Sequence, residues 1–442
     1  MFQRSKIAPG DVHETLRKHM LVDGFSLVVD LEHSHGSWAK DAKTGQEYLD
    51  FFSFFASNPV GFNHPALRDE ETQERLARAA TYKVANSDKY TTFMAEFVDT
   101  LARSAGRPEL PHYFFVDGGA LAVENALKVA FDWKVRKNLA AGRGEIGKKV
   151  LHFERAFHGR SGYTLSITNT DPNKTQYFPM FDWPRIPAPE KHFPFDDAAR
   201  ADVEAREKKT IAAAEAAFAA SPHEIAAIII EPVQGEGGDR HFRREFFQAL
   251  RKLADEHEAM LILDEVQTGL GLTGKYWAYE HFGVTPDIIS FAKKLQIGGI
   301  FVGKRVDEVE DNVFKKPGRI NSTWGGSLVD MVRCTRILEV VENEKLVDNS
   351  RDRGKELLAG LEGIQERHKG VTNARGLGLM CALDMPDTET RNAAVKACFA
   401  DGTIVLPCGT RSVRFRPALT VTAEEVAEGV KRLEKGIAAV LK

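Results

Sequence analysis

The chain has 442 residues, a formal net charge of −3 and 43% hydrophobic residues. A chain of this length exceeds one comfortable hydrophobic core, so the composition favours a globular protein of two domains. The nearly balanced charge argues against a nucleic-acid or anionic-membrane partner, and no apolar run approaches the ~18 residues needed to cross a bilayer.

The first 69 residues are expected to form the N-terminal segment of a small domain. Residues 26–31 and 46–50 have the composition of short strands, and a turn signal before the second allows the two to pair. The aromatic run at 51–55 is interpreted as core packing in preference to the wall of a substrate pocket. Residues 1–6 are not followed by the apolar segment that a secretory signal requires, so a cytoplasmic location is expected.

Residues 70–325 are expected to form a large domain, because short apolar runs alternate there with longer stretches of helical period. Strands are expected at 112–116, 150–153, 225–230, from 261, and at 287–292, with helices at 121–137 and 211–220. This alternation is typical of a doubly wound, mostly parallel α/β sheet. Five prolines between 178 and 194 predict an extended excursion over the surface or into a subunit contact.

Residues 326–442 are expected to form a smaller α+β domain that also collects the N-terminal segment. Helices are expected at 328–342, 388–400 and 423–441, around short strands at 376–383 and 413–416. The cysteines have no metal-ligand spacing, so no metal site is predicted and they are expected to be reduced thiols. They are Cys334, Cys381, Cys398 and Cys408.

Two predicted strand ends carry residues suited to chemistry. The strand that starts at Leu261 ends in Asp264, and the strand at 287–292 is followed at once by Lys293 and Lys294. In parallel sheets, ligands bind outside the carboxyl ends of the strands. A buried acid and a lysine in these positions are what a pyridoxal phosphate enzyme requires, because the lysine forms a Schiff base and the acid keeps the ring nitrogen protonated. The alternative is that Asp264 is an ordinary cap or turn residue.

Two loops that follow predicted strands are candidates for binding a cofactor or substrate. Gly119 and Ala120 begin a predicted helix, where free amides and the helix dipole favour a phosphate; a tight strand-to-helix turn is the simpler alternative. After the next strand, Phe157 is placed to stack on a pyridine ring, and Arg160 to hold a carboxylate through a bidentate contact. Arginines are usually solvated, so the glycine-flanked loop is what singles out Arg160.

Glu236 and Arg414 are further candidates for binding substrate. Glu236 lies among glycines after a strand end, where the backbone can approach a ligand closely. A flexible surface loop with a solvated acid explains the same residues equally well. Arg414 lies near the end of the chain, and sequence spacing alone does not pair it with Glu236.

Five motifs occur in the order found in class III (ω-) aminotransferases. They are Gly-Gly-Ala-Leu-Ala-Val-Glu from Gly118, Phe-His-Gly-Arg from Phe157, Asp-Glu-Val-Gln-Thr-Gly from Asp264, the lysine after its strand, and Asn-Ser-Thr-Trp-Gly-Gly from Asn321. From about Val12 to the C-terminus the chain resembles this family, and within it the branch that acts on the ε-amine of lysine. The resemblance implies a fold-type I pyridoxal-phosphate-dependent transferase and a homodimer with the site at the subunit interface.

The resemblance also implies how the cofactor is held. Lys293, in preference to Lys294, would be the Schiff-base lysine, Asp264 would pair with the pyridine nitrogen, and Gln267 would bond the phenolic oxygen. Thr323 would arrive from the neighbouring subunit to bind the phosphate.

The phosphate cup departs from the pattern of many relatives. Those relatives have a Ser or Thr hydroxyl where this chain has Gly119 and Ala120. The expected phosphate contacts are therefore the two amides and Thr323.

The reaction implied by the resemblance is transfer of the ε-amino group of L-lysine to 2-oxoglutarate, giving 2-aminoadipate 6-semialdehyde and glutamate. Arg160 would hold the carboxylate farthest from the reacting carbon, and Arg414 the α-carboxylate of 2-oxoglutarate. Glu236 would neutralise Arg414 while lysine is bound. The alternatives are an ω-aminotransferase for ornithine or 4-aminobutyrate, a pyridoxal phosphate racemase or decarboxylase, and a protein that binds the cofactor without catalysis.

Overall fold

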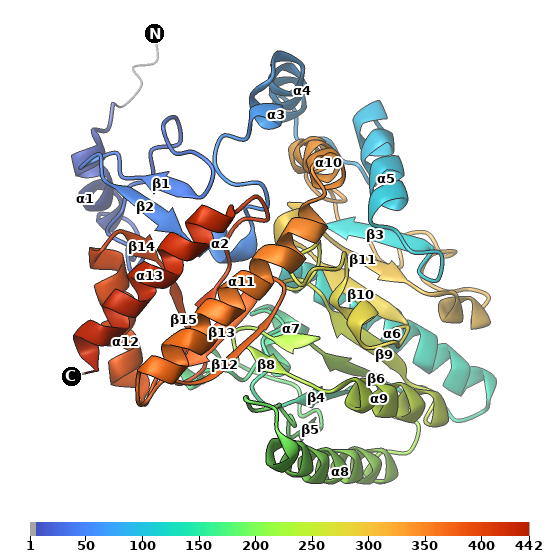
Figure 1. The fold of residues 1–442 in the computed structure, drawn as a ribbon. Helices are drawn as coiled ribbons and strands as arrows, with labels where there is room; N and C mark the ends of the chain where they lie inside the picture. The colour runs from blue at the N-terminus through green and yellow to red at the C-terminus, as the bar shows by residue number, and fades with distance from the viewer. Residues whose placement is uncertain (1–5, 442) are drawn as a thin grey trace.

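The central sheet of the computed structural model, which describes residues 6–441, has seven strands (Figure 1). In spatial order they are β3 (His112–Val116), β11 (Gly298–Val302), β10 (Ile288–Phe291), β9 (Met260–Asp264), β6 (Ile225–Ile230), β4 (Lys149–Phe153) and β5 (Arg185–Ile186). The last five strands in this order are parallel, and β11 is antiparallel to both of its neighbours. The predicted doubly wound, mostly parallel sheet is confirmed.

Helices cover both faces of the sheet because successive side chains of its strands point to opposite sides. In β9, Ile262 packs with the buried residues of α6 (Gly119–Ala140), whereas Leu261 and Leu263 join a cluster that includes side chains of α8 (Asp197–Ala220) and α9 (Arg244–Glu256). The strands are consequently buried on both faces, which is why their sequences are continuous runs of apolar residues.

β11 was not predicted from the sequence. Only residues 292–297 separate it from β10, too few for the crossover of about a dozen residues that a parallel neighbour requires. The chain therefore folds back antiparallel, and this short turn holds Lys293 and Lys294 at the carboxyl edge of the sheet.

Strands from the two ends of the chain pair with each other. In one sheet, β2 (Glu47–Asp50) lies between β1 (Trp38–Lys40) and β14 (Thr403–Ile404), and Figure 1 shows the blue strands β1 and β2 beside the red C-terminal helices. A strand at 26–31 was wrongly predicted, because only Val29 forms a bridge there, to Asp41. This pairing agrees with the expectation that the N-terminal segment packs into the C-terminal small domain. The domain boundaries at 69 and 325 stay a prediction.

A second sheet in the C-terminal part has four strands. In spatial order they are β12 (Thr372–Leu377), β13 (Met380–Asp384), β16 (Ser412–Phe415) and β15 (Leu406–Cys408). The single strand predicted at 376–383 is in fact two antiparallel strands. Gly378, with φ +56°, makes the turn between them, and a Cβ there would lie 2.4 Å from the carbonyl carbon of Thr273.

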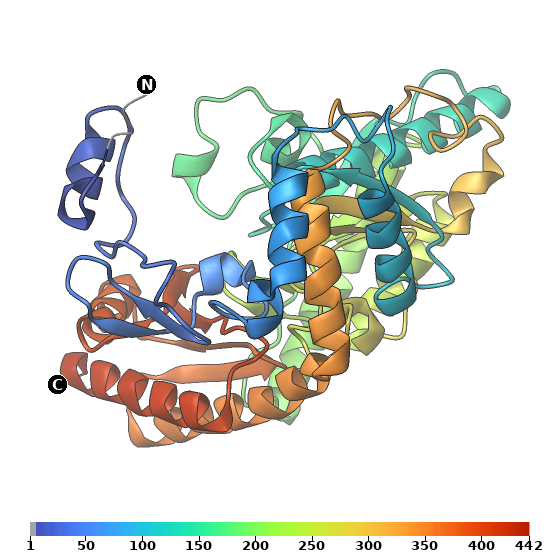
Figure 2. The same cartoon turned by 90° about the horizontal axis from the view of Figure 1, so that it is seen from above.

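Long helices pack against these sheets and beside the central one. Those of the C-terminal part are α11 (Leu346–Arg367), α12 (Thr388–Ala400) and α13 (Ala423–Val440). Beside the central sheet, α10 (Leu328–Asn343) packs against both α4 (Glu70–Ala80) and α5 (Thr92–Ser104), as Figure 2 shows. Predicted helices are present at α6, α8, α10, α12 and α13.

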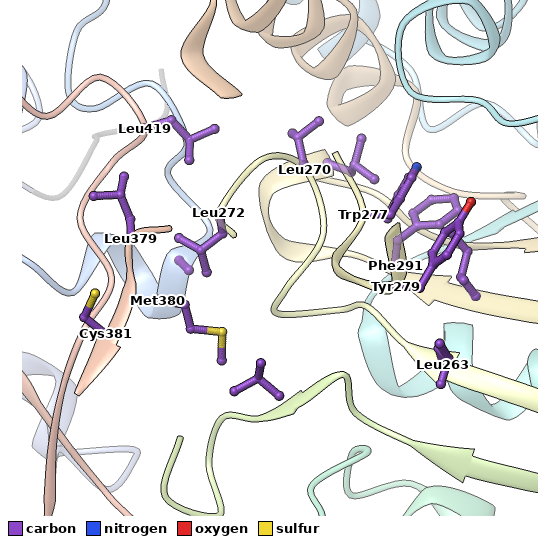
Figure 3. Close-up of a cluster of buried hydrophobic side chains, with 14 of the residues drawn as sticks. Leu263, Leu270, Leu272, Trp277, Tyr279, Phe291, Leu379, Met380, Cys381 and Leu419 are labelled. Carbon is purple, nitrogen blue, oxygen red and sulfur yellow. The ribbon is translucent and has the colours of Figure 1, made fainter. Parts of the chain in front are cut away.

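Leu272 and Leu379 join the central sheet to the C-terminal part. Leu379 donates its amide to the carbonyl of Leu272 at 2.9 Å, and Ser350 Oγ donates to the same carbonyl at 2.8 Å. Figure 3 shows Leu263, Leu270 and Trp277 in the same buried cluster as Leu379, Met380 and Leu419. One continuous core therefore crosses from the sheet to the C-terminal part.

The aromatic run at 51–55 is only partly core. Phe51 is fully buried, but Phe54 and Phe55 are 42% and 49% exposed, so core packing was the wrong interpretation for these two. All four residues of α2 (Ser53–Ala56) have positive φ angles between 45° and 64°. This left-handed turn is costly for residues other than glycine and directs Phe54 and Phe55 outward.

The proline-rich segment is on the surface only in part: the chain before Trp183 belongs to a loop that projects from the body in Figure 2, whereas Arg185 and Ile186 form the edge strand β5 of the central sheet. Phe178, Met180 and Phe181 are each at least half exposed, and Tyr177 is almost fully so. In the described part of the chain, no helix is long and apolar enough to cross a membrane. The prediction about the start of the chain falls mainly on residues 1–5, outside the described residues.

Candidate active site

A pocket of about 520 Å³ lies at the carboxyl edge of β4, β6 and β9, beside the N-terminus of α6. Eight of the predicted site residues line this one pocket. They are Gly119, Ala120, Phe157, Arg160, Glu236, Asp264, Gln267 and Lys293. Arg414 lies behind Glu236 and contacts it, whereas Thr323 is exposed and does not line the pocket.

The first turn of α6 directs backbone amides without a side-chain cap toward the pocket. Gly118, the residue before the helix, has φ +88° and no side chain to cap these amides. A Cβ on Gly119 would lie 2.8 Å from Cγ1 of Val266, so only glycine lets this turn approach β9 so closely. The 22-residue helix directs its positive end here, which suits a phosphate.

Asp264 ends β9 as a buried carboxylate held by three donors. Its Oδ1 accepts from the Val266 amide at 3.1 Å and from Ser290 Oγ at 3.0 Å, and its Oδ2 accepts from His158 Nδ1 at 2.7 Å. Each carboxylate oxygen accepts about two hydrogen bonds, so Oδ2 keeps one position for a donor in the pocket. This arrangement suits a protonated ring nitrogen.

His158 and Glu231 surround Asp264 and were not among the predicted site residues. The Nε2 atom of His158 is buried and has no partner among the described residues. Burial raises the pKa of Glu231 to about 7, although the amides of Phe157 and Gly235 donate to its carboxylate. Glu231 follows β6 as Asp264 ends β9, so its strand-end position was a usable signal; His158 lay inside a motif already noted.

Lys293 and Lys294 point to different surroundings. Lys293 lines the pocket, has φ +49°, and has a pKa lowered to about 8, chiefly by burial and then by the charge of Arg414. Lys294 is buried and donates to the carbonyl oxygen of Gln267 at 2.7 Å. Lys294 does not line the pocket, so its side chain serves the packing of the turn.

Arg416 fixes the orientation of Gln267. Its guanidinium donates to Oε1 of Gln267 at 2.9 and 3.1 Å, so the amide NH₂ is the end left for the pocket. Arg416 also makes a fully buried bidentate pair with Asp239. This pair connects the end of β16 to the glycine-rich loop at 235–238, which directly precedes Asp239. A Cβ on Gly235 would lie 2.2 Å from the same Oε1, so this loop tolerates only glycine there.

Phe157 and Arg160 come from the loop after β4. Phe157 lines the pocket with its ring, and Arg160 reaches the pocket from an exposed position. A Cβ on Gly159 would lie 2.6 Å from that of Ala120, which explains the glycine between the two residues. The loop is therefore pressed against the first turn of α6.

Glu236 bridges two cations. Its Oε2 accepts from Arg414 Nη2 at 2.7 Å, and its Oε1 accepts from Lys174 Nζ at 2.6 Å. Burial by itself would raise the pKa of Glu236, but Arg414 and Lys174 hold it below the ordinary value. Arg414 is 2% exposed, and its Nε and Nη1 atoms have no partner among the described residues. Lys174 was not predicted, because it lies in a loop without a pattern.

The residues of the pocket fit pyridoxal phosphate. A glycine turn with free amides suits the phosphate, the open position on Asp264 suits the ring nitrogen, and Lys293 has an amine of lowered pKa beside both. Among residues 6–441, no group of three or more His, Cys, Asp or Glu side chains is arranged to hold a metal ion. The four cysteines are buried and free.

Comparisons with known proteins agree with this geometry. The profile of the family Aminotransferase class-III matches residues 22–437. The L-lysine-epsilon aminotransferase of Amycolatopsis lactamdurans is 54% identical, over 97% of this chain and 96% of the relative. The solved lysine aminotransferase from M. tuberculosis is 52% identical, with a TM-score of 0.96 over 98% of this chain and 100% of that one.

A more distant relative shows the breadth of the similarity. The mitochondrial 4-aminobutyrate aminotransferase of Homo sapiens is 30% identical, over 93% of this chain and 86% of the relative. The family match covers nearly the whole chain, and the same fold is found in the solved relatives. The chain therefore belongs to the class III aminotransferases, which are pyridoxal-phosphate-dependent enzymes of fold type I.

Proposed function

We propose that this aminotransferase transfers the ε-amino group of L-lysine to 2-oxoglutarate, giving 2-aminoadipate 6-semialdehyde and glutamate. The observation that carries the choice of lysine is the difference in identity. Relatives named L-lysine-epsilon aminotransferase are 51–54% identical over nearly the whole chain, whereas those named for 4-aminobutyrate are 30–33% identical. The ion pair between Glu236 and Arg414 supports the use of two substrates with different charges.

In this proposal, the amides of Gly119 and Ala120 hold the cofactor's phosphate, Phe157 stacks on its ring, and the NH₂ of Gln267 donates to its phenolic oxygen. The carboxylate of Asp264 accepts a hydrogen bond from the protonated ring nitrogen, whose positive charge it stabilises. When bound, pyridoxal phosphate supplies an aldehyde that reacts with amines and a ring that accepts electrons.

Lys293 is proposed to hold the cofactor covalently and then to move protons. Once the substrate amine has replaced it, Lys293 takes a proton from the carbon that bears the reacting nitrogen, as a general base. As a general acid, it would then deliver this proton to the carbon that was the cofactor's aldehyde carbon. The lowered pKa of about 8 supports this use, because a proton carrier works best when its pKa lies near the working pH.

The two substrates are proposed to share Arg160. It binds the carboxylate farthest from the reacting carbon in each, while Arg414 binds only the α-carboxylate of 2-oxoglutarate. When lysine is bound, Glu236 pairs with Arg414, so that no buried charge is left without a partner.

A homodimer is proposed, with each site completed by Thr323 of the neighbouring subunit. Large apolar side chains support such an interface: Leu121, next to the pocket-lining Ala120, and Trp324, next to Thr323, are 43% and 42% exposed. A cytoplasmic location is retained as a proposal, and the free cysteines support it.

The direct test is a panel of amino donors with 2-oxoglutarate as acceptor, scored by glutamate formation. Lysine is expected to be the best donor, ahead of ornithine and 4-aminobutyrate. Glutamate formation distinguishes the proposal from racemase, decarboxylase and non-catalytic alternatives. If ornithine or 4-aminobutyrate gave the highest kcat/KM, the choice of lysine would be wrong, whereas no glutamate from any donor would reject 2-oxoglutarate as the acceptor.

The roles of Glu236 and Arg414 are tested by measuring each half-reaction alone. Glu236→Ala leaves Arg414 free, so the lysine half-reaction is expected to weaken and the glutamate half-reaction to strengthen. Arg414→Ala is expected to cost 2-oxoglutarate about 2–5 kcal/mol of binding, because a buried charge-assisted contact is lost, and to cost lysine much less. Equal losses in both half-reactions for both variants would mean that the pair supports the fold or the cofactor.

A further inference from the structure

Lys174 belongs to the same charge cluster as Glu236 and Arg414, although it comes from a distant surface loop. It is the last residue of η2 (Pro172–Lys174), and its Nζ lies 2.6 Å from Oε1 of Glu236. The ammonium also lies 5.3 Å from the centre of the Phe157 ring, on the wall of the pocket. The Lys174 side chain is 22% exposed and that of Arg414 is 3% exposed. Lys174 therefore approaches Glu236 from the solvent side, and Arg414 from the buried side.

The backbone of Glu236 is held in place, so only its side chain is free to move. Its carbonyl accepts from the Gly409 amide at 2.9 Å, and Gly235 and Gly237 pack so closely that a Cβ on either would lie about 2 Å from a neighbouring atom. Release of Arg414 therefore requires a rotation of the Glu236 side chain. The carboxylate needs a second partner when it leaves Arg414, because an unpaired charge in this half-buried place is unfavourable.

We propose that Lys174 is the specificity-determining residue that keeps Glu236 paired after it has left Arg414, and so allows Arg414 to bind the second carboxylate of a dicarboxylic acid. Lys174 acts through Glu236, so it is a positioning residue. The inference rests on the proposed function, in which Arg414 binds the α-carboxylate of 2-oxoglutarate. Removal of the Lys174 charge stabilises the Glu236–Arg414 pair relative to the open arrangement, and so disfavours dicarboxylates.

The test is binding of glutarate, an unreactive five-carbon dicarboxylate, to the holoenzyme by calorimetry. Lys174→Met is expected to raise the Kd of glutarate about tenfold, and Lys174→Arg to restore most of the affinity because it keeps the charge. The lysine half-reaction is expected to change less than twofold in both variants. Lys191→Met is the matched control for the loss of one positive charge, since Lys191 faces the rings of Phe193 and Phe195 and not Glu236.

A double variant distinguishes an effect of Lys174 that acts through Glu236 from a general effect of losing a positive charge. Glu236→Gln is expected to strengthen glutarate binding, and adding Lys174→Met to it is expected to change the Kd no further. A tenfold loss that persists in the Glu236→Gln background would overturn the inference, as would a loss of the same size in the Lys191→Met control or in the lysine half-reaction.

If Arg414 does not bind a dicarboxylate at all, the glutarate measurements give a different result from the one expected when only the role of Lys174 is wrong. If Arg414→Lys leaves the Kd of glutarate unchanged, then Arg414 does not bind the dicarboxylate and the proposed substrate site is wrong. If Arg414→Lys weakens glutarate while Lys174→Met does not, the site stands and the role of Lys174 is rejected. The glutarate measurement does not depend on which amine is the donor.

Discussion

Lys293 combines a left-handed backbone conformation with a lowered side-chain pKa. Its φ of +49° is uncommon outside glycine, and such positions often occur where function requires them. The short turn between β10 and β11 imposes this conformation and directs the amine into the pocket. The neighbouring Lys294 follows the same turn and is directed to the carbonyl of Gln267.

The pKa of Lys293 predicts how the enzyme without cofactor regains it. Only the neutral amine attacks the cofactor's aldehyde, and its pKa is lowered from the ordinary value of a lysine to about 8. The rate of covalent reloading is therefore expected to fall about tenfold per pH unit below pH 8 and to level off above it. Stopped-flow absorbance across this pH range measures the rate.

The control for this prediction is Lys293→Ala, reduced with borohydride after addition of pyridoxal phosphate. No covalent label is expected in the variant. Persistent labelling, located at Lys294 by peptide mapping, would transfer the role to that residue.

Asp264 gives a second prediction at the scale of one residue. Asp264→Asn keeps the shape of the side chain but removes the charge that stabilises a protonated ring nitrogen. The variant is expected to bind the cofactor and to lose about 2 to 4 orders of magnitude in turnover. Absorbance gives the fraction of sites loaded, and turnover per loaded site gives the effect. A loaded variant with near-normal turnover would reject the proposed role.

At the scale of elements, the first turn of α6 contacts the turn after β9 through Gly119 and Val266. Gly119→Ala introduces a Cβ 2.8 Å from Cγ1 of Val266, so the helix start must shift away from the strand. The amides then move from the phosphate position, and the Kd of the cofactor is expected to rise about tenfold, which corresponds to about 1.4 kcal/mol. Titration of the apoenzyme followed by absorbance measures this Kd.

Gly162→Ala is the matched control for the Gly119 variant. Gly162 is also the first residue of a helix, α7 (Gly162–Ser166), but a Cβ there meets only Oε1 of Glu124, at 4.0 Å. Its cofactor affinity is expected to be unchanged. Equal affinities for the two variants would mean that the first turn of α6 does not bind the phosphate.

At the scale of the whole molecule, the proposed dimer gives a complementation test. If Thr323 serves the pocket of the neighbouring subunit, Thr323→Ala weakens cofactor binding about tenfold, by loss of a hydrogen bond to a charged group. In a hybrid of Thr323→Ala with the inactive Lys293→Ala, one pocket has Lys293 from one subunit and the intact Thr323 from the other.

The hybrid is therefore expected to recover wild-type cofactor affinity in its one reactive pocket. Differently tagged subunits, mixed and purified by both tags, allow this affinity to be measured. If the reactive pocket of the hybrid stays as weak as that of the Thr323→Ala homodimer, Thr323 acts within its own subunit.

Part of the fold was predictable because its signals are local. Buried parallel strands appear as short apolar runs, so β3, β4, β6, β9 and β10 were found, with Asp264 and Lys293 at strand ends. Pairings between distant segments have no such signal, and β14 beside β2 is set only when the C-terminal part folds over the N-terminal segment. The left-handed turn at 53–56 was missed for a related reason: tertiary contacts override local preference there.

The sequence by itself determined the fold class, the strand-end position of Asp264, and the glycines that let α6 approach the sheet. These depend on side-chain periodicity and on backbone sterics, which act over a few residues. The family resemblance favoured Lys293 over Lys294, and the tertiary structure shows that Lys293 faces the pocket. The tertiary structure alone decided that Arg416 orients Gln267 and that Glu236 lies between Arg414 and Lys174. Such charge pairs depend on distance in space, and residues 174, 236 and 414 become neighbours only when the sheets and loops have packed.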